Sequence, residues 1–225
     1  MKYRHELKFL VSDRELEILR YRLKALMEQD RHQRGDSYRI RSLYFDDFRD
    51  SYLQENEDGV DQRKKYRIRI YDGEDTIIKL EKKSKVRTMT SKEGVLLSKE
   101  ETQLYMKGQA PAIKDDDSFL KKEFFAQIKA NGLRPVCIVE YERTAFVERI
   151  GNVRVTFDRN ISGSNKAECF FEYAPMTPVL PAGQHILEVK YDELLPDYIA
   201  QVLEIGTLQR TSFSKYYYAR KCEDI

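Results

Sequence analysis

The sequence contains no tryptophan, only three histidines and only three cysteines. Cys137, Cys169 and Cys222 are odd in number and form no C-x-x-C pair, which argues against a disulfide framework and against a zinc site. No apolar run is long enough to span a bilayer, and the first residues lack an apolar signal core. We therefore expect a cytoplasmic chain without direct membrane insertion, so that any membrane contact would come through a partner protein.

The common nucleotide-binding and hydrolase motifs are also missing. The sequence has no P-loop, no G-x-G-x-x-G and no G-x-S-x-G. The 40 Lys and Arg nearly balance the 38 Asp and Glu, so net charge alone points neither to nucleic acid nor to a membrane. With 225 residues, 41% of them hydrophobic, the chain is long enough for one large domain, which we expect to span residues 1–225.

Alternation of polar and apolar residues predicts seven strands, and capping signals predict four helices. The strands are expected at 3–11, 38–45, 64–71, 76–84, 136–146, 153–161 and 185–191. The helices are expected after Ser12, after Ser98, at about 118–130 and from Pro196 to near Gly206, with Leu16, Leu19, Leu23 and Leu26 as the apolar stripe of the first. Residues 56–59 read as a turn, and the segment SFSKYYYAR fits either a helical cap or an extended chain.

The stretch KKYRIRIY, residues 64–71, has an unusual distribution of charge. Read at period two, Lys65, Arg67 and Arg69 share one face, while Tyr66 and the isoleucines lie opposite. Other predicted strands repeat the pattern of one charged and one apolar face. Their charged faces hold Arg4, Glu6 and Lys8; Arg39 and Arg41; Lys79, Glu81 and Lys83; Tyr141 and Arg143; Arg154, Thr156 and Asp158; and Glu188 and Lys190.

Two architectures accommodate such strands. An ordinary sandwich turns the apolar faces inward and leaves the charged faces in water. If the amphipathic helices instead cover the outside of a closed sheet, the charged faces line its interior. Crowded cations repel one another unless a polyanion is bound, and Arg and Lys match phosphate oxygens, so we favour the second arrangement.

The few acids on the charged faces are candidate ligands for Mg²⁺ or Mn²⁺. Both ions bind through one or two carboxylates together with phosphate oxygens. Glu6, Glu81, Asp158 and Glu188 qualify by position, although each can equally pair with a neighbouring cation. We expect Glu188, followed by Glu6, to be the metal ligands.

Eight motifs in order resemble one protein family. YRHELKF, YRIRSLYFDD, KKYRIRIY, IIKLEKKSK, VEYERTAF, VRVTFDRNI, ILEVKYD and SFSKYYYAR resemble the catalytic domain of the vacuolar transporter chaperone (VTC) polyphosphate polymerases, within the triphosphate tunnel metalloenzymes. The resemblance implies an α+β fold: a closed eight-stranded antiparallel β-barrel with amphipathic helices packed outside. It also implies a divalent metal and transfer of the γ-phosphate of ATP to a growing polyphosphate chain.

The resemblance also implies roles for individual residues. Arg67, Arg69, Arg143, Arg154 and Lys215 would act at the transferred phosphoryl group, and Glu188 would hold the metal. The remaining phosphate-binding positions would be Lys8, Arg39, Arg41, Lys79, Lys83, Tyr141 and Ser214. To these we add Lys65 and Lys190, which lie on the charged strand faces. Ser214 and Lys215 would close over the phosphates from the C-terminal segment.

The chain departs from the wider tunnel family at its first motif. Arg4-x-Glu6-x-Lys8 replaces the more usual E-x-E-x-K, which favours the polymerase branch over the adenylate cyclase and thiamine triphosphatase branch. The phosphate-sensing SPX domain and the membrane segments of the eukaryotic complex are not found in this sequence. Three alternatives remain: a triphosphatase that uses water as acceptor, a non-catalytic polyphosphate-binding module, and nucleic-acid binding. We expect no nucleic-acid binding, because most Tyr residues lie opposite the cations instead of beside them.

Overall fold

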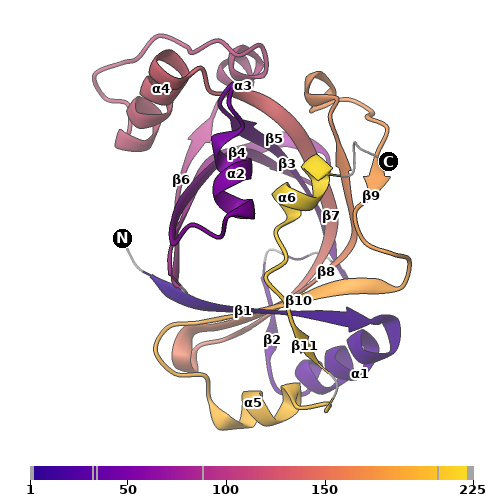
Figure 1. Cartoon of the computed structure of the whole chain (residues 1–225). Helices are drawn as coiled ribbons and strands as arrows, with labels where there is room; N and C mark the ends of the chain where they lie inside the picture. The colour runs from indigo at the N-terminus through magenta and orange to yellow at the C-terminus, as the bar shows by residue number, and fades with distance from the viewer. Residues whose placement is uncertain (1–2, 32, 34, 88, 207, 222–225) are drawn as a thin grey trace.

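The computed structural model describes residues 3–31, 33, 35–87, 89–206 and 208–221. Cys222 lies outside these residues. Within them the fold is α+β, as the sequence predicts, with one large antiparallel sheet and six α-helices (Figure 1). The strands are β1 (Arg4–Ser12), β2 (Glu28–Gln29), β3 (Tyr38–Asp46), β4 (Gln62–Tyr71), β5 (Glu74–Val86), β6 (Met89–Leu97), β7 (Arg134–Glu148), β8 (Val153–Ser164), β9 (Thr177–Pro178), β10 (Gln184–Tyr191) and β11 (Gln209–Arg210).

Eight long strands among the described residues pair in a ring. Around the ring the order is β7, β3, β4, β5, β6, β1, β10 and β8, and β8 pairs again with β7. Every pairing is antiparallel, and the shortest joins β1 to β6 through Arg4 opposite Thr90 and His5 opposite Met89. In Figure 1 the strands of the ring surround an open centre. We refer to these eight strands as the ring.

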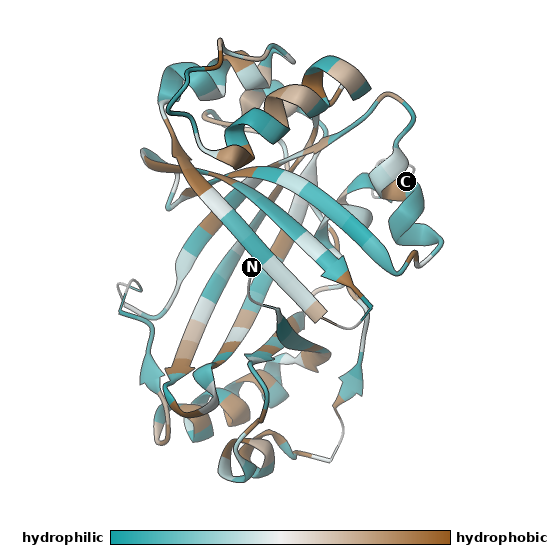
Figure 2. Cartoon of the chain, turned by 90° about the vertical axis from the view of Figure 1, so that its left-hand side faces the viewer, coloured by the Kyte–Doolittle hydropathy of each residue, from teal (hydrophilic) through white to brown (hydrophobic). Residues whose placement is uncertain are grey.

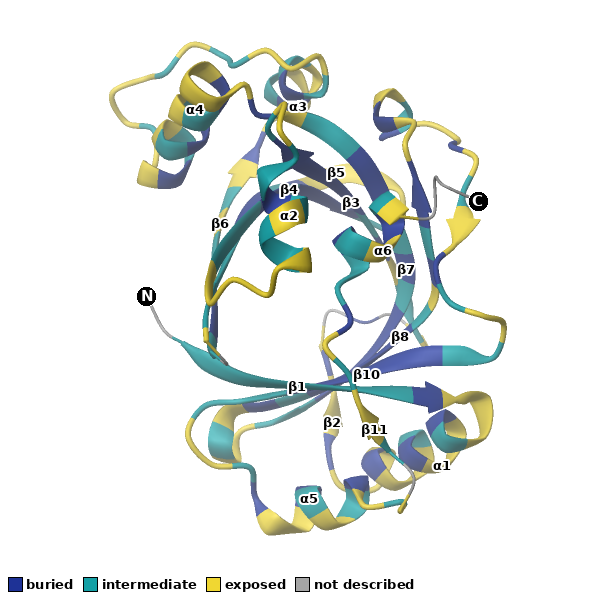
Figure 3. Ribbon diagram, in the orientation of Figure 1, coloured by how far each residue is buried: buried dark blue, intermediate teal, exposed yellow. Residues whose placement is uncertain are grey.

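Four helices pack on the outer surface of the ring. They are α1 (Asp13–Lys24), α3 (Lys99–Met106), α4 (Phe119–Asn131) and α5 (Asp197–Leu203). Figure 1 shows α1 and α5 beside β1 and β10, and α3 and α4 at the opposite end of the molecule, while Figure 2 shows hydrophilic and hydrophobic residues mixed along the strands between them. The helices bury their apolar sides and leave exposed residues outward (Figure 3). This confirms that the apolar strand faces point toward the helices.

The helix signals in the sequence are accurate at three termini. Ser12 and Ser98 each form a capping box with the Glu three residues later. The backbone N–H of that Glu donates to the Ser hydroxyl oxygen, at 3.3 Å in the first box and 3.1 Å in the second. Gly132 ends α4 in the left-handed region, at φ 63°. The predicted stripe of α1 is one residue too long: the helix ends at Lys24, and Leu26 is 46% exposed.

Two further helices lie at one mouth of the ring. They are α2 (Ser51–Glu57), where the sequence reading placed only a turn, and α6 (Lys215–Lys221), formed by the C-terminal YYYAR segment. The capping group of α2 is remote in sequence: the Asp46 carboxylate accepts hydrogen bonds from the backbone N–H groups of Tyr52 and Leu53, at 3.0 and 3.1 Å. The same carboxylate accepts from the Tyr216 hydroxyl and so connects α2 to α6.

Strand β6 was also missed from the sequence. Its residues, MTSKEGVLL, alternate poorly because neither face is wholly apolar. Lys92 turns toward Glu81 inside the ring, and Glu93 pairs with Lys82 outside it. A strand with charge on both faces gives little periodic signal.

Candidate functional site

A large cavity fills the interior of the ring. Its volume is about 1010 Å³, and its wall comes from the eight long strands together with residues 212–216 of the C-terminal segment. Among the described residues that line it, fifteen are Lys or Arg and five are Asp or Glu. We refer to this space as the cavity. Its wall is strongly cationic although the whole chain is nearly neutral.

The cavity brings together most of the site residues predicted from the sequence. Its wall includes Lys8, Lys65, Arg67, Arg69, Lys79, Lys83, Tyr141, Arg143, Arg154, Lys190, Ser214 and Lys215, together with Glu6 and Glu188. In β4 the alternation works as expected, because Lys65, Arg67 and Arg69 face the cavity while Tyr66 is fully buried against Phe124 of α4.

The prediction that Arg39 and Arg41 belong to the charged interior is wrong. On β3 the cavity is lined by Tyr38, Ile40 and Tyr44, so the two arginines point to the outer side of the ring. Arg41 forms an ion pair with Glu140 of β7 at 2.6 Å, and the backbone N–H of Arg39 donates a hydrogen bond to the Asp72 carboxylate at 2.8 Å. The physical reason is cross-strand pairing: acids of β7 stand opposite these arginines on the outer surface.

Two deeply buried carboxylates organise the arginines. Glu81 is 1% exposed and contacts Arg67 at 2.8 Å, Arg69 at 3.6 Å and Lys92 at 2.9 Å. Burial alone would raise the pKa of Glu81, but these cations hold it far below its usual range. Glu81 therefore stays ionised and fixes the two arginine side chains in direction.

Asp158 has the corresponding role on the opposite wall. It is fully buried and accepts two hydrogen bonds from the Arg143 guanidinium, at 2.6 and 2.7 Å. Lys215 of α6 contacts Oδ2 of the same carboxylate at 2.5 Å, and this oxygen also accepts from Arg143. Burial would raise the pKa of Asp158, and Arg143 and Lys215 lower it instead. Bidentate contacts of this kind position a guanidinium with its remaining N–H groups toward the cavity.

Glu6 and Glu188 lie close together on the cavity wall. Lys83 contacts Glu6 at 2.8 Å, and Lys190 contacts both carboxylates, at 3.6 Å to Glu6. Burial raises the pKa of each acid, yet the surrounding lysines lower both well below the ordinary value. Two adjacent ionised carboxylates are hard oxygen donors, which suits Mg²⁺ or Mn²⁺ when phosphate oxygens complete the coordination. The described residues contain no group of three or more ligand-type side chains, so a caged protein site is not formed there.

Several cations in the cavity have no carboxylate partner. Lys65 donates to Asn56 Oδ1 at 2.7 Å and to Ser214 Oγ at 3.1 Å, and no ion pair to it is found in the described part of the chain. Burial lowers the pKa of Lys65 well below its usual value, and the charges of Lys83 and Arg63 lower it further. Burial also lowers the pKa of Lys83 to about 8, even though Lys83 pairs with Glu6 at 2.8 Å. The wall thus holds more positive charge than its own acids compensate.

Tyr141 stands between Arg69, Arg143 and Lys215 of the cavity wall. Its hydroxyl accepts a hydrogen bond from Arg69 at 3.1 Å, and the Arg143 guanidinium carbon and Lys215 Nζ lie over its ring at 5.2 and 4.8 Å. Burial would raise the pKa of Tyr141, but Arg143 and Arg69 reverse the shift and lower it. The ring therefore supports the arginines by cation–π contact, and the lowered pKa makes the hydroxyl a better hydrogen-bond donor to an anion.

The C-terminal segment closes part of one mouth of the cavity. The Lys8 amine donates a hydrogen bond to the Phe213 carbonyl at 2.8 Å, and the Lys65 amine donates one to the Ser214 hydroxyl oxygen at 3.1 Å. Further along, α6 packs so closely on β8 that a Cβ at Gly163 would lie 2.7 Å from the Ala219 Cβ. Ser214 and Lys215 are thereby held beside the strand cations, where the sequence motif predicted them.

Some residues of the wall were not singled out from the sequence. They are Arg31, Tyr38, Tyr44, Arg63, Tyr71, Lys85 and Lys92. The Tyr44 hydroxyl accepts a hydrogen bond from the Arg67 guanidinium at 2.9 Å. Continued alternation beyond Lys65 and Lys83 would have found Arg63 and Lys85, whereas Lys92 lies on the strand whose pattern is weak.

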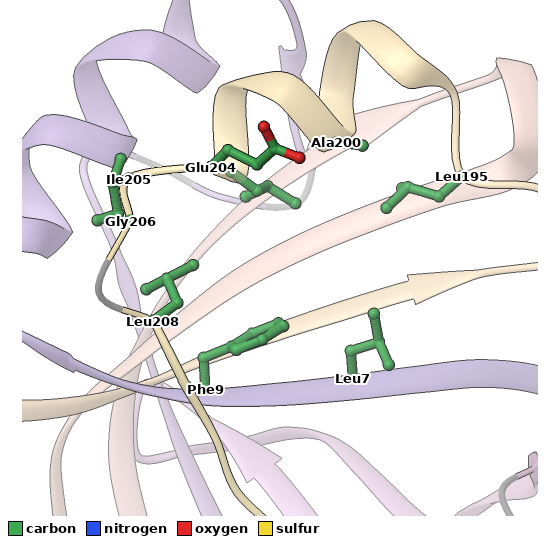
Figure 4. Close-up of a pocket in the computed structure, with 9 residues that line it drawn as sticks. Leu7, Phe9, Leu195, Ala200, Glu204, Ile205, Gly206 and Leu208 are labelled. Atoms are coloured by element: carbon green, nitrogen blue, oxygen red, sulfur yellow. The ribbon is translucent and has the colours of Figure 1, made fainter.

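A second, smaller cavity lies outside the ring and has a different character. Its volume is about 470 Å³, and it lies between the outer face of β1 and the segment containing α5 (Figure 4). Leu7, Phe9, Leu195 and Leu208 are among its lining residues, and Glu204 is the one charged residue among them. An apolar wall with a single acid offers nothing to a phosphate group, so this cavity does not compete with the first as a phosphate site.

Within the described residues no helix is long and apolar enough to cross a membrane; the longest, α4, has 13 residues.

Comparison with solved structures shows likeness of fold. A candidate adenylate cyclase from Bacillus halodurans is 14% identical, with 91% of this chain and 88% of that chain covered and a TM-score of 0.51. A protein from Pyrococcus horikoshii is 15% identical, with 99% of both chains covered and a TM-score of 0.49. The Mimivirus capping enzyme triphosphatase is 12% identical, with 92% and 90% covered and a TM-score of 0.42. Of these three, the first alone reaches a TM-score of 0.5, and at its identity it shows a shared fold alone.

A search of curated proteins gives no match. The family model described as the VTC domain, in contrast, matches residues 3–223, nearly the whole sequence. This agrees with the resemblance carried by the eight motifs and with the cationic interior of the strand ring. The chain belongs to the VTC domain family.

Proposed function

We propose that the ring is a closed tunnel barrel that binds a nucleoside triphosphate and transfers its γ-phosphoryl group to phosphate or to the end of a polyphosphate chain. The observation that carries the proposal is the excess of basic over acidic side chains on the cavity wall, fifteen Lys or Arg against five Asp or Glu among the described lining residues. Such a wall is costly when empty and becomes favourable when a polyanion supplies the missing negative charge. A phosphate chain fits this requirement, since its charge is distributed along its length.

The residues divide into two groups by their position in the cavity. Arg67, Arg69 and Arg143 are oriented by buried carboxylates, and Arg154 pairs with Asp30, so their guanidinium groups suit the crowded charge of a transferring phosphoryl group. Lys215 joins them from α6. The lysines on the remaining wall, with Ser214 and Tyr141, would hold the rest of the chain: Lys8, Lys65, Lys79, Lys83 and Lys190.

The reaction itself requires little covalent chemistry from the protein. An oxygen of the acceptor phosphate attacks the γ-phosphorus, the bond from the γ-phosphorus to the bridging oxygen breaks, and the nucleoside diphosphate leaves with that electron pair. The side chains hold donor and acceptor in line and neutralise charge. Glu188, with Glu6 beside it, would hold Mg²⁺ or Mn²⁺, which when bound would neutralise phosphate oxygens.

The proposal includes the wider setting of the chain. We place it in the cytoplasm, where ATP is supplied, as one domain over residues 1–225, with a membrane-associated partner if the product is exported. Two other outcomes use the same cavity: water as acceptor would make the chain a triphosphatase, and binding without turnover would make it a polyphosphate receptor.

Product analysis separates these outcomes. The purified protein is incubated with ATP and Mn²⁺ or Mg²⁺, with and without pyrophosphate as primer, and the phosphates are resolved by chain length. We expect long chains from the wild type and from Arg41→Ala, which alters the outer surface, and none from Arg67→Ala or Glu188→Ala. Free phosphate as the sole product would assign a triphosphatase, and tight tripolyphosphate binding without turnover would assign a receptor; either result would overturn the polymerase proposal.

A further inference from the structure

One mouth of the cavity has an apolar inner wall. Tyr38, at the start of β3, and Tyr71, at the end of β4, both line the cavity, and their ring centroids are 6.3 Å apart. Ile40 stands opposite Tyr71 on the neighbouring strand but is only 1% exposed. Ile77 of β5 also lines the cavity and is 48% exposed. Aromatic and aliphatic side chains therefore gather at this mouth, next to the acids Asp72 and Glu74, whereas the rest of the wall is mainly cationic.

A local irregularity in the sheet produces this mouth. Arg69 pairs with Lys79, but the next pairing joins Tyr71 to Glu74, so the register of β4 and β5 shifts between them. Bulges at the rim of a strand ring redirect side chains and are frequent near active sites. Ile77 lies on the inner face of β5, two residues before Lys79, and reaches the cavity, while Ile78 on the outer face is 2% exposed. Lys79 Nζ lies over the Tyr71 ring at 5.9 Å, which connects the apolar wall to the cations.

The opposite mouth is chemically different. β4 begins there, and Arg63, Lys65 and Lys85 line the cavity beside the C-terminal segment. Arg63 stands opposite Lys85 across the two strands. Phe213 and Tyr216 also line the cavity here, but they are 3% and 2% exposed, and Lys65 Nζ covers the Tyr216 ring at 4.9 Å. The groups open to a ligand at this mouth are therefore mainly cations, which fit phosphate groups. A ligand with phosphates at one end and an apolar ring at the other would therefore have one preferred direction in the cavity.

We propose that the wall formed by Tyr38, Tyr71 and Ile77 binds the nucleobase of a nucleoside triphosphate. This inference rests on the proposed function, since it assumes that the triphosphate occupies the cations. A bare phosphate chain gains nothing from apolar side chains, whereas a nucleobase has a flat π-face that stacks on aromatic rings whatever its identity. The nucleoside thus lies at the Tyr71 mouth, with its phosphates pointing toward Arg69 and the centre of the ring.

The test compares two ligands that share a triphosphate but differ in the nucleoside. Dissociation constants for ATP and for tripolyphosphate are measured by calorimetry, with the same divalent ion, on the wild type and on Tyr71→Leu. We expect Tyr71→Leu to weaken ATP binding about tenfold and tripolyphosphate binding by less than about twofold, because a stacked base is lost and no charge is changed. Tyr71→Phe keeps the ring and should bind ATP like the wild type.

Two further variants serve as controls. Ile77→Thr changes a half-exposed residue while keeping a β-branched side chain, so it should fold, and it should weaken the binding of ATP but not of tripolyphosphate. Lys79→Gln should weaken the binding of both ligands. Equal losses of ATP and tripolyphosphate in Tyr71→Leu and Ile77→Thr, or no loss of ATP, would overturn the nucleobase site. Failure of the wild type to bind tripolyphosphate would instead refute the proposed function, and the inference with it.

Discussion

Binding of a polyanion should draw protons onto lysines of the cavity. Burial lowers the pKa of both Lys83 and Lys92 to about 8, so each loses part of its charge at mildly alkaline pH. A bound anion favours the charged form and raises both pKa values toward the ordinary lysine value. Each amine then takes up a proton from solution as the anion binds. The protein should therefore bind protons together with its ligand.

The size of the uptake follows from these pKa values. With a pKa of about 8, each amine is about one quarter protonated at pH 8.5 and about nine-tenths protonated at pH 7. If the bound anion restores the charge of both, Lys83 and Lys92 together take up about 1.5 protons at pH 8.5 and about 0.2 at pH 7. Lys65 adds to this uptake, because burial lowers its pKa as well.

Calorimetry in buffers of different ionisation enthalpy counts these protons. Trimetaphosphate is a suitable probe, because its own phosphates do not titrate in this range. Lys83→Gln should lose about 0.7 proton of the uptake at pH 8.5. Lys82→Gln should lose none, since Lys82 lies on the outer face and pairs with Glu123 at 2.6 Å. Uptake near zero at pH 8.5, or an equal loss in both variants, would refute the reasoning.

The same shifts determine how the ligand-free protein responds to pH. The folded-state pKa of Lys83, about 8, lies below the value of 10.5 for an unperturbed lysine. Between these two pH values the unfolded chain binds more protons than the folded protein, so the contribution of Lys83 to the free energy of unfolding rises with pH. Urea titrations at pH 8 and pH 9.5 should show this rise, and Lys83→Gln should reduce it. A rise of the same size in Lys83→Gln would show that Lys83 is not its source.

Two structural predictions concern the support of the cavity wall. Asp158→Asn leaves the buried Arg143 without its bidentate partner, so urea titration should show a loss of about 3–5 kcal/mol in the free energy of unfolding; a loss below about 1 kcal/mol would contradict the assigned role. Gly163→Ala forces its new Cβ against Ala219 and should lower the free energy of unfolding by about 1–3 kcal/mol. The control Gly94→Ala meets only ordinary van der Waals contacts, so its melting temperature should lie closer to that of the wild type. Equal melting temperatures for the two variants would contradict the close packing of α6.

The inner faces of several strands could be predicted because their alternation is strong and local. Lys65, Arg67 and Arg69 alternate with Tyr66 and two isoleucines, and this pattern alone specifies which side meets the helices. The pattern failed at Arg39 and Arg41, where the sequence is equally regular. There the decisive information lies about a hundred residues away, in Glu140 and Glu142 of β7, which stand opposite the two arginines.

The elements that were missed lack the usual local signals. The N-cap residue of helix α2, Asp50, makes no side-chain capping bond, and the N-terminal donors of the helix are satisfied by Asp46 and Asp47 at the end of β3 and just after it. Strand β6 carries charge on both faces because Lys92 turns to an interior acid and Glu93 to an exterior lysine. Only the three-dimensional arrangement of the ring identifies these partners.

Two neighbouring lysines of β4 test the central claim most directly. Lys65 faces the cavity without an ion pair in the described residues, whereas Lys64, on the opposite face, lies over the Tyr66 ring at 5.7 Å. Either change to Gln removes one amine, which a bound polyanion would hold in its charged form, and leaves no buried carboxylate unpaired. The measurement is tripolyphosphate affinity by calorimetry. If the cavity is the phosphate site, Lys65→Gln should weaken binding about tenfold and Lys64→Gln by less than about twofold. Equal effects of the two changes would contradict the account.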